Sequence, residues 1–270
     1  MLSKRMEAVV NMVAPQSFVV ADVGCDHAYV SIALIEKEIA KKTIAMDVRQ
    51  GPLRIAEGNV KAADLEEKIE LRLSDGLEKL SPGEVDTIII AGMGGLLVKR
   101  ILEQGIEVLR VENPPVLILQ PQSDMAAVRI FLHSSAYHIV QETMLLEDGK
   151  YYTVMRAEPG AYRQIQDSHI DADGRTHWNV ITGENQIMQY TRADWEYGRY
   201  NLEHRDKVLF AFLVREHRQL LKIKKSILDN LPADGEAAVH TENRFKEVCR
   251  SLEDNREVLK RYYDYELQEG

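Results

Sequence analysis

The chain has 270 residues, of which 45% are hydrophobic and 29% are charged, and its formal net charge is -9. This length suffices for one large domain or for a domain with an appendage, and the acidic balance argues weakly against nucleic-acid binding. The two cysteines form no disulfide framework and lie in no His/Cys cluster with metal-ligand spacing, and no apolar run approaches the length of a membrane span. We therefore expect a cytoplasmic protein without a metal and without a membrane anchor.

A regular alternation of strand-like and helix-like runs fills the chain up to residue 159. Strands that are apolar on both faces and separated by helices are typical of a parallel sheet covered on both sides. Asp148-Gly149, between two later strand-like runs, is typical of a hairpin turn. We predict an α/β fold, Rossmann-like, with a mostly parallel sheet that ends in an antiparallel hairpin. The expected strands are 17–22, 43–47, 69–73, 86–91, 115–120, 136–146 and 151–157, and the expected helices are 29–39, 51–63, 96–109 and 124–135.

The rest of the chain differs in character from this first domain, residues 1–159. Residues 160–191 are polar and lack a clear period, so we interpret them as a linker or insertion with room for short strands around 178–181. Residues 192–270 are expected to form a helical, coiled-coil-like domain, with helices at 202–231 and 241–263 broken at Pro232-Ala233-Asp234-Gly235. Two long helices joined by a short loop form an antiparallel pair.

The most informative motif is the turn after the first strand, Asp22-Val23-Gly24-Cys25-Asp26-His27-Ala28-Tyr29. A single glycine followed by an acid differs from the glycine triad that holds a pyrophosphate, which disfavours an NAD dehydrogenase. Asp47 ends the second strand 23 residues after Gly24, near the spacing of about 20 residues seen for a ribose-binding acid. The turn suits a nucleoside cofactor that lacks phosphates and carries a cationic centre. We therefore expect S-adenosyl-L-methionine as cofactor and a methyltransferase.

Each residue of this motif also has a plainer interpretation. Asp22 can attract the cofactor's ammonium group or organise the turn. Asp26 and His27 are expected at the cofactor, but Asp26 can instead be an N-cap, and His27 and Tyr29 can simply pack. Asp47 can accept hydrogen bonds from ribose hydroxyls or cap the helix that follows.

Two later segments complete the expected cofactor site. Asp75-Gly76 follows the third strand, where Asp75 can accept a hydrogen bond from the adenine amine or merely form a turn. Asn59 is a weaker candidate for the adenine edge. Gly92-Met93-Gly94 follows the fourth strand, and its glycines permit close backbone approach at the expected position of the transferable methyl group. The alternative is a flexible loop that caps the next helix.

Together these residues resemble the bacterial tRNA (adenine-22-N1)-methyltransferases, the TrmK family. The resemblance implies a class I methyltransferase fold, S-adenosyl-L-methionine as donor, tRNA as substrate and a two-helix C-terminal domain that helps to hold the tRNA. The fourth-strand motif lacks the Asn/Asp-Pro-Pro-aromatic signature of exocyclic-amine methyltransferases, which is consistent with attack by a ring nitrogen. The segments that carry the resemblance are Leu2-Ser3-Lys4-Arg5, the turn motif, Asp47, Asp75-Gly76, Ala91-Gly92-Met93-Gly94-Gly95, Leu119-Gln120-Pro121, Gly149-Lys150-Tyr151-Tyr152 and the helical tail.

Methylation of adenine N1 needs alignment more than a strong base, because N1 has a free lone pair at neutral pH. Asp26 or Asp86 is expected to stabilise the cationic product, and Tyr29, Met93 or Tyr152 is expected to hold a base flipped from its stack. The candidate catalytic residues are Asp26, Tyr29, Gly92 and Met93.

A local reversal of charge marks the expected RNA surface. From Arg205 to Lys225 seven Lys and Arg face two Asp and Glu, a balance of +5 in an acidic chain. Such clusters contact phosphates and make binding depend on salt, although a solvated helix face has the same composition. The candidate RNA contacts are Lys4, Arg5, Arg215, Arg218, Lys222 and Lys225.

Two other functions are compatible with these motifs. One is a methyltransferase that acts on a small molecule or a protein, with the helical tail serving dimerisation. The other is a cofactor-binding regulator or RNA-binding module without catalysis. Both a monomer and a homodimer fit the sequence.

Overall fold

The computed structural model describes residues 2–160, 163–171, 175–182, 186–230 and 236–267. The chain divides into two compact units, Met1–Tyr190 and Thr191–Gly270. Each unit is described by itself below. The expected helix break at Pro232-Ala233-Asp234-Gly235 falls outside the described residues.

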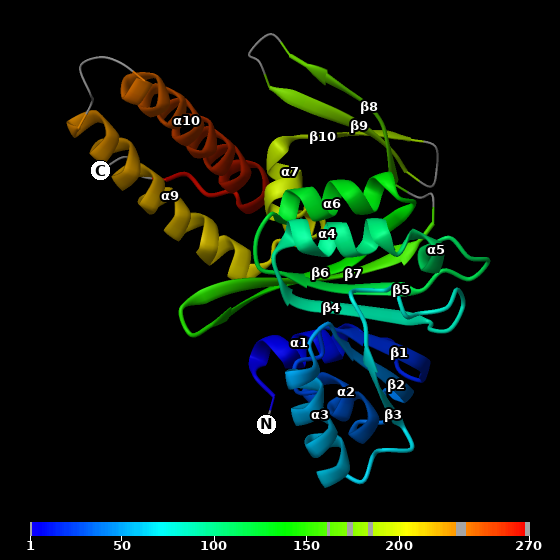
Figure 1. Ribbon diagram of the computed structural model, residues 1–270. Helices are drawn as coiled ribbons and strands as arrows, with labels where there is room; N and C mark the ends of the chain where they lie inside the picture. The colour runs from blue at the N-terminus through cyan, green and yellow to red at the C-terminus, as the bar shows by residue number, and fades with distance from the viewer. Residues whose placement is uncertain (1, 161–162, 172–174, 183–185, 231–235, 268–270) are drawn as a thin grey trace. The chain divides into compact units, whose positions relative to one another are not determined.

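A seven-stranded sheet in the order β3-β2-β1-β4-β5-β7-β6 forms the centre of the first unit (Figure 1). β1 to β5 pair in parallel, whereas β7 runs antiparallel to both β5 and β6. This confirms the predicted fold class, including the hairpin that ends the sheet. The strands are β1 (Ser17–Val23), β2 (Ala40–Asp47), β3 (Ile69–Leu73), β4 (Thr87–Met93), β5 (Val116–Pro121), β6 (Tyr137–Glu147) and β7 (Lys150–Pro159).

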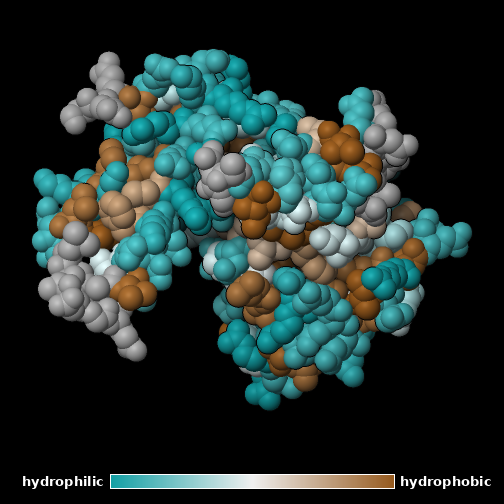
Figure 2. Space-filling view, turned by 90° about the horizontal axis from the view of Figure 1, so that it is seen from above, coloured by the Kyte–Doolittle hydropathy of each residue, from teal (hydrophilic) through white to brown (hydrophobic). Residues whose placement is uncertain are grey.

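Helices cover both faces of this sheet, as the continuous apolar strands predict. Ile88 and Ile90 of β4 belong to one buried cluster, with side chains of α4, α5 and α6, whereas Ile89 belongs to a second cluster, with side chains of α1, α2 and α3. On the face shown in Figure 2, the apolar side chains that remain exposed are scattered among hydrophilic ones. The helices are α1 (Lys4–Met12), α2 (Tyr29–Glu36), α3 (Gln50–Ala62), α4 (Gly95–Gln104), α5 (Ile106–Leu109) and α6 (Met125–Ser134).

The turn between β6 and β7 follows from its sequence. Asp148 and Gly149 have φ values of 49° and 76°. Two consecutive residues with positive φ match the twist of a two-residue hairpin, and Asp-Gly adopts this conformation readily.

Residues 160–191, which we expected to be a linker or insertion, contain a second sheet. β8 (Arg163–Ile170), β9 (Thr176–Thr182) and β10 (Ile187–Tyr190) form an antiparallel sheet in the order β10-β9-β8. Most described side chains of β8 are exposed, so the sequence shows no apolar alternation. Cross-strand contacts stabilise the pairing instead, including a 2.6 Å hydrogen bond from Asn179 Nδ2 to Asp167 Oδ1.

The second unit is helical, with an antiparallel pair at its centre. It contains α7 (Arg192–Tyr197), α8 (Arg199–Glu203), α9 (Lys207–Asp229) and α10 (Glu236–Tyr263). Going along α9, Phe210 packs on Tyr263 of α10 and His217 forms a hydrogen bond with Asn255 of α10, so the two helices run in opposite directions. The first long helix begins later than expected because Asp206 caps α9, with its Oδ1 accepting from the backbone N–H groups of Val208 and Leu209 at 2.8 Å.

Candidate active site and a second groove

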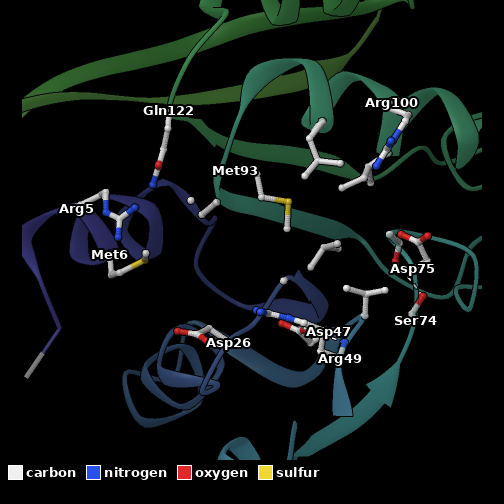
Figure 3. Close-up of a pocket in the computed structure, with 18 residues that line it drawn as sticks. Arg5, Met6, Asp26, Asp47, Arg49, Ser74, Asp75, Met93, Arg100 and Gln122 are labelled. Atoms are coloured by element: carbon white, nitrogen blue, oxygen red, sulfur yellow. Dashed lines mark hydrogen bonds and ion pairs between the residues drawn. The ribbon is translucent and has the colours of Figure 1, made fainter. Parts of the chain in front are cut away.

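A cavity of about 610 Å³ lies in the first unit, where the carboxyl ends of β1, β2, β3 and β4 meet (Figure 3). In open parallel sheets, ligands bind at this edge, next to the point where the strand order reverses. The reversal falls between β1 and β4. The volume lies within the range of about 300–1,000 Å³ typical of small-molecule and cofactor sites.

Gly24 shapes the turn at the floor of this cavity. The backbone N–H groups of Gly24 and Cys25 both donate to the carbonyl oxygen of Met46 at 2.8 Å, which ties the turn to β2. Gly24 has φ of +74°, and a Cβ at this position would collide with Cε of Met93. The positive φ therefore favours glycine, and a larger residue would also displace the tip of the Met93 side chain.

Asp22 lies below the cavity rather than in its lining. Its carboxylate is buried and accepts a 2.8 Å hydrogen bond from the Ser31 hydroxyl of α2. Burial raises the pKa of Asp22 to about 6. Of the two roles considered for Asp22, this position supports organising the turn.

Of the residues after Gly24 in the turn motif, Asp26 lines the cavity, whereas His27 and Tyr29 lie outside its lining. Asp26 is not the N-cap of α2, because Ala28 holds that position in the left-handed conformation with φ of 60°. His27 and Tyr29 make an edge-to-face contact, with ring centroids 5.9 Å apart. The placement of Tyr29 gives no support to a role at the reacting atoms.

Asp47 lines the cavity at the end of β2, and only 5% of its surface is exposed. Its Oδ1 accepts from the backbone N–H of Arg49 at 2.8 Å, and Arg49 Nε lies 3.7 Å from the same oxygen. Arg49 is the N-cap of α3, so Asp47 does not cap that helix. A buried carboxylate with remaining acceptor capacity suits a pair of hydroxyl groups.

Ser74-Asp75-Gly76 lines the cavity next to Asp47 (Figure 3). The Ser74 hydroxyl donates to the Gly76 carbonyl at 3.0 Å, and Gly76 has φ of +54°. Asn59 lies elsewhere: its side-chain amide donates to the His27 carbonyl at 3.0 Å and does not line the cavity. Asn59 therefore braces the turn from α3.

The Gly92-Met93-Gly94 run is less of a loop than expected. β4 continues through Met93, and Gly94 caps α4. Gly92 and Met93 line the cavity, whereas Gly94 does not. The backbone N–H of Gly92, which has φ of +79°, donates to Gln120 Oε1 at 3.1 Å. This hydrogen bond ties the end of β4 to Gln120 of β5.

Asp86 was expected near the same rim, and this expectation is wrong. Asp86 immediately precedes β4, at the opposite end of the strand from Met93. Its Oδ2 accepts from the backbone N–H groups of Phe18 and Val19 at 2.6 and 3.2 Å. Asp86 therefore secures the pairing between β1 and β4 and is far from the reacting atoms.

The N-terminal helix α1 contributes to the cavity in a way the sequence reading missed. Arg5 and Met6 both line it, so Arg5 belongs to the cavity, while Lys4 is exposed at the start of α1. Ser3 caps the helix by accepting from the backbone N–H of Met6 at 3.3 Å. This cap and the helical spacing of Met6, Val9 and Val10 were the available signals. The other cavity residues not predicted include Val48, Arg49, Leu97 and Arg100.

A second concave surface lies in the helical unit. This groove, about 720 Å³ in volume, follows one face of α9 and is closed by Tyr265. Three of the predicted RNA contacts line it, Arg215, Arg218 and Lys222, together with the aromatic side chains of Phe210 and Tyr265. Lys225 is exposed on the same helix but outside the groove lining.

Two properties of the described residues bear on ligands. No helix among them is long and apolar enough to cross a membrane. Within the same residues, no group of three or more His, Cys, Asp or Glu side chains is arranged to hold a metal ion.

Comparison with known proteins defines the class to which this fold and cavity belong. Residues 2–155 match a family model described as a methyltransferase domain. The match covers more than half of the chain, so the protein belongs to the methyltransferase-domain family.

Closer relatives identify the particular family. The tRNA (adenine(22)-N(1))-methyltransferase of Bacillus subtilis is 40% identical over 159 residues, which are 59% of this chain and 66% of the relative. The solved structure of the B. subtilis m1A22 tRNA methyltransferase TrmK covers 96% of this chain and 99% of its own, with 31% identity and a TM-score of 0.74. The Streptococcus pneumoniae protein Sp1610 in complex with S-adenosyl-L-methionine has the same identity and TM-score and covers 96% of this chain and 100% of its own. This chain is therefore a member of the TrmK family.

Proposed function

We propose that the protein transfers a methyl group from S-adenosyl-L-methionine to N1 of adenine 22 in tRNA. The observation that carries this proposal is the meeting of Gly24, Asp47 and Gly92-Met93 in one cavity at the carboxyl edge of the sheet. Relatives that cover nearly the whole chain are named for this reaction, and one of the solved structures contains the cofactor.

The cavity residues fit the cofactor by their chemistry. Asp47 offers a buried carboxylate for the two ribose hydroxyls, and Asp75 lies beside it as an acceptor for the adenine amine. The Gly24 turn presents bare backbone to the cavity, beside which the amino acid portion can lie. Asp26 adds a carboxylate at the end of the cavity where a cationic sulfonium gains from a negative neighbour.

The chain has little acid–base chemistry to perform at the reacting atoms. Bound S-adenosyl-L-methionine supplies an electrophilic methyl group, and adenine N1 supplies a lone pair. The protein must align the two and tolerate a cationic product. The rigid Gly92-Met93 backbone provides the close approach, and Asp26 provides negative charge near the forming cation.

The adenine must leave its stack to expose N1, which lies on its Watson–Crick edge. Of the three side chains considered for holding the flipped ring, Met93 lines the cavity. Tyr152 lies against Arg5, with its ring centroid 5.1 Å from the guanidinium carbon. We assign Met93 as the contact for the flipped base, since thioethers pack favourably on aromatic rings.

The groove on α9 is proposed as the tRNA-binding surface of the helical unit. Arg215, Arg218 and Lys222 supply charge for phosphates, and Lys4 and Lys225 are further exposed cations. Because the substrate is tRNA, we place the reaction in the cytoplasm.

The decisive test is a product analysis. The purified protein is incubated with S-adenosyl-L-methionine and an unmodified tRNA transcript, and the digested RNA is analysed for 1-methyladenosine by mass spectrometry. We expect the product with the natural transcript, none with guanosine at position 22 and none with the Asp47→Ala variant. Cofactor binding without any methylated nucleoside would reject tRNA as acceptor and favour a small molecule or a protein.

A further inference from the structure

The cofactor residues named above leave one end of the cavity without an assigned ligand. In Figure 3, Ser74, Asp75 and Arg100 lie at one end, and Arg5, Met6 and Gln122 lie at the other, with Met93 between them. The cofactor's adenosine portion is assigned to Asp47 and Asp75. The end that Arg5 and Gln122 share is therefore on the far side of the methyl position, where an acceptor must enter.

The Arg5 guanidinium is fixed next to Gly92 by two contacts. Its Nη1 donates to Gln120 Oε1 at 3.1 Å, and that same oxygen accepts from the Gly92 backbone N–H at 3.1 Å. The guanidinium carbon also lies 5.1 Å from the ring centroid of Tyr152. A hydrogen bond and a ring contact together restrict a side chain that is otherwise long and mobile.

Arg5 lines the cavity, and its Nη1 donates the hydrogen bond to Gln120 described above. A guanidinium has five N–H donors, and the buried Nε has no hydrogen-bond partner within the described part of the chain. A Cβ built on Gly92 would lie 3.6 Å from Arg5 Nη1 and 3.9 Å from Gln122 Nε2. Two donor side chains therefore flank a stretch of bare backbone at this end of the cavity.

The chemistry of the product selects which part of the acceptor Arg5 can hold. Adenine methylated at N1 is a cation, and a second cation against the ring would oppose its formation. A phosphodiester has the opposite charge and the geometry that a guanidinium binds with two parallel hydrogen bonds. Gln122, which is neutral and has both a donor and an acceptor, suits the base edge instead.

We propose that Arg5 binds the backbone phosphate of the tRNA nucleotide that is methylated and thereby positions its adenine over Gly92-Met93. This assignment rests on the proposed function. It places Arg5 inside the active site rather than on an outer RNA-binding surface.

The test compares Arg5→Gln and Arg5→Lys in the full-length protein. Lys42→Gln is the matched control, because Lys42 is an exposed cation near the beginning of β2, whereas Asp47 ends that strand at the cavity. The measurements are KM and kcat with tRNA, the salt dependence of tRNA binding, and the dissociation constant of S-adenosyl-L-methionine by calorimetry. We expect Arg5→Gln to raise KM for tRNA about tenfold and to lower the salt slope by about 1. Arg5→Lys should restore the salt slope but only part of KM, and Lys42→Gln should leave all parameters unchanged.

The alternative is that Arg5 only ties α1 to the sheet. In that case Arg5→Gln would lower the melting temperature or cofactor affinity while KM for tRNA and the salt slope stay at the wild-type values, and the proposal would be overturned. Failure of the proposed function is a separate result, because it would appear as a wild-type protein that binds the cofactor but methylates no tRNA.

Discussion

The cavity of the first unit and the groove on α9 are both concave and both carry charged side chains, yet their charges differ in kind. The cavity mixes both signs, whereas the charged side chains that line the groove, among the described residues, are all cationic. A ligand with a cationic centre and a hydroxylated sugar needs the first arrangement, and a polyanion needs the second. The net charge of -9 is therefore a poor guide to the local charge at either site. The charged cavity residues are Arg5, Asp26, Asp47, Arg49, Asp75 and Arg100, and those of the groove are Arg215, Arg218 and Lys222.

The largest expected difference between the cavity and the groove comes from removing Asp47, the proposed hydrogen-bond acceptor for the ribose. Asp47→Ala deletes a buried carboxylate that can accept two charge-assisted hydrogen bonds, each worth about 1.5–3 kcal/mol. We expect the dissociation constant of S-adenosyl-L-methionine to rise about 1,000-fold, close to 4 kcal/mol. Titration calorimetry measures this directly.

The companion measurement is tRNA binding by the same variant without cofactor. Because the groove is built from the other unit, Asp47→Ala should bind tRNA within about twofold of the wild type, and Asp47→Asn should retain part of the cofactor affinity. An equal loss of cofactor and tRNA binding would contradict the division of labour.

A second effect comes from the buried carboxylate below the cavity. Burial raises the pKa of Asp22 from 3.8 to about 6, so the folded state holds its proton more tightly than the unfolded chain. The protonated Asp22 carboxyl group therefore stabilises the folded state in full below pH 4, and this stabilisation is lost as the pH rises through 6. Relative to Asp22→Asn, the wild type should lose up to about 3 kcal/mol between pH 4 and pH 7.

Denaturant titrations of both proteins across that pH range test the expectation. Ser31→Ala provides the opposite change, because it removes a hydrogen bond that lowers the pKa of Asp22. Its loss of stability with rising pH should be larger than that of the wild type. A constant difference between wild type and Asp22→Asn at every pH would show that Asp22 is not the group that titrates.

These regions also differ in how far the sequence alone predicts them. Gly24, Asp47 and Asp75-Gly76 could be placed together because each follows an apolar strand, and parallel strands share a carboxyl edge. Arg5 could not be placed, because its partner Gln120 is 115 residues away and no local pattern connects them. Burial decides similar cases: the sequence does not distinguish Asp22, which lies beneath the cavity, from Asp26, which lines it.

Of the second sheet, the sequence predicted only short strands around 178–181, which lie in β9, and β8 and β10 were missed for a different physical reason. β8 exposes most of its described side chains, so no face of it is marked by apolar residues. Its pairing depends on contacts such as Asn179 with Asp167, which only the register brings together. Periodicity reports burial, and a strand that buries little leaves no periodic signal.

Reversing charge in the groove should produce a smaller effect, confined to tRNA. In the double variant Arg218→Glu and Lys222→Glu, two attractive contacts with phosphates become repulsive. We expect tRNA affinity to fall about 30-fold, near 2 kcal/mol, and the salt slope to fall by about 2. Filter binding at several salt concentrations measures both, while cofactor affinity should not change.

The control for this variant makes the same charge change elsewhere. Lys61→Glu with Lys68→Glu reverses two exposed cations of the first unit that do not line the cavity. An equal loss of tRNA affinity in the control would mean that net charge, rather than the groove, governs binding.

The smallest effect we expect comes from the aromatic end of the groove. Tyr265 is 37% exposed, and its ring meets Phe210 edge-to-face with centroids 5.2 Å apart. An exposed ring beside cations is the combination on which unpaired bases stack, at about 1–3 kcal/mol for each base. Tyr265→Ala should therefore weaken tRNA binding about fivefold without changing the salt slope, since no charge is removed.

Tyr265→Phe distinguishes stacking from the other roles of this side chain. It keeps the ring and its contact with Phe210 and removes only the hydroxyl, so it should bind tRNA as the wild type does. A loss in both variants would assign the effect to the hydroxyl. A loss in neither would leave the cations as the sole determinants of the groove, and the contrast with the cavity would then be one of charge alone.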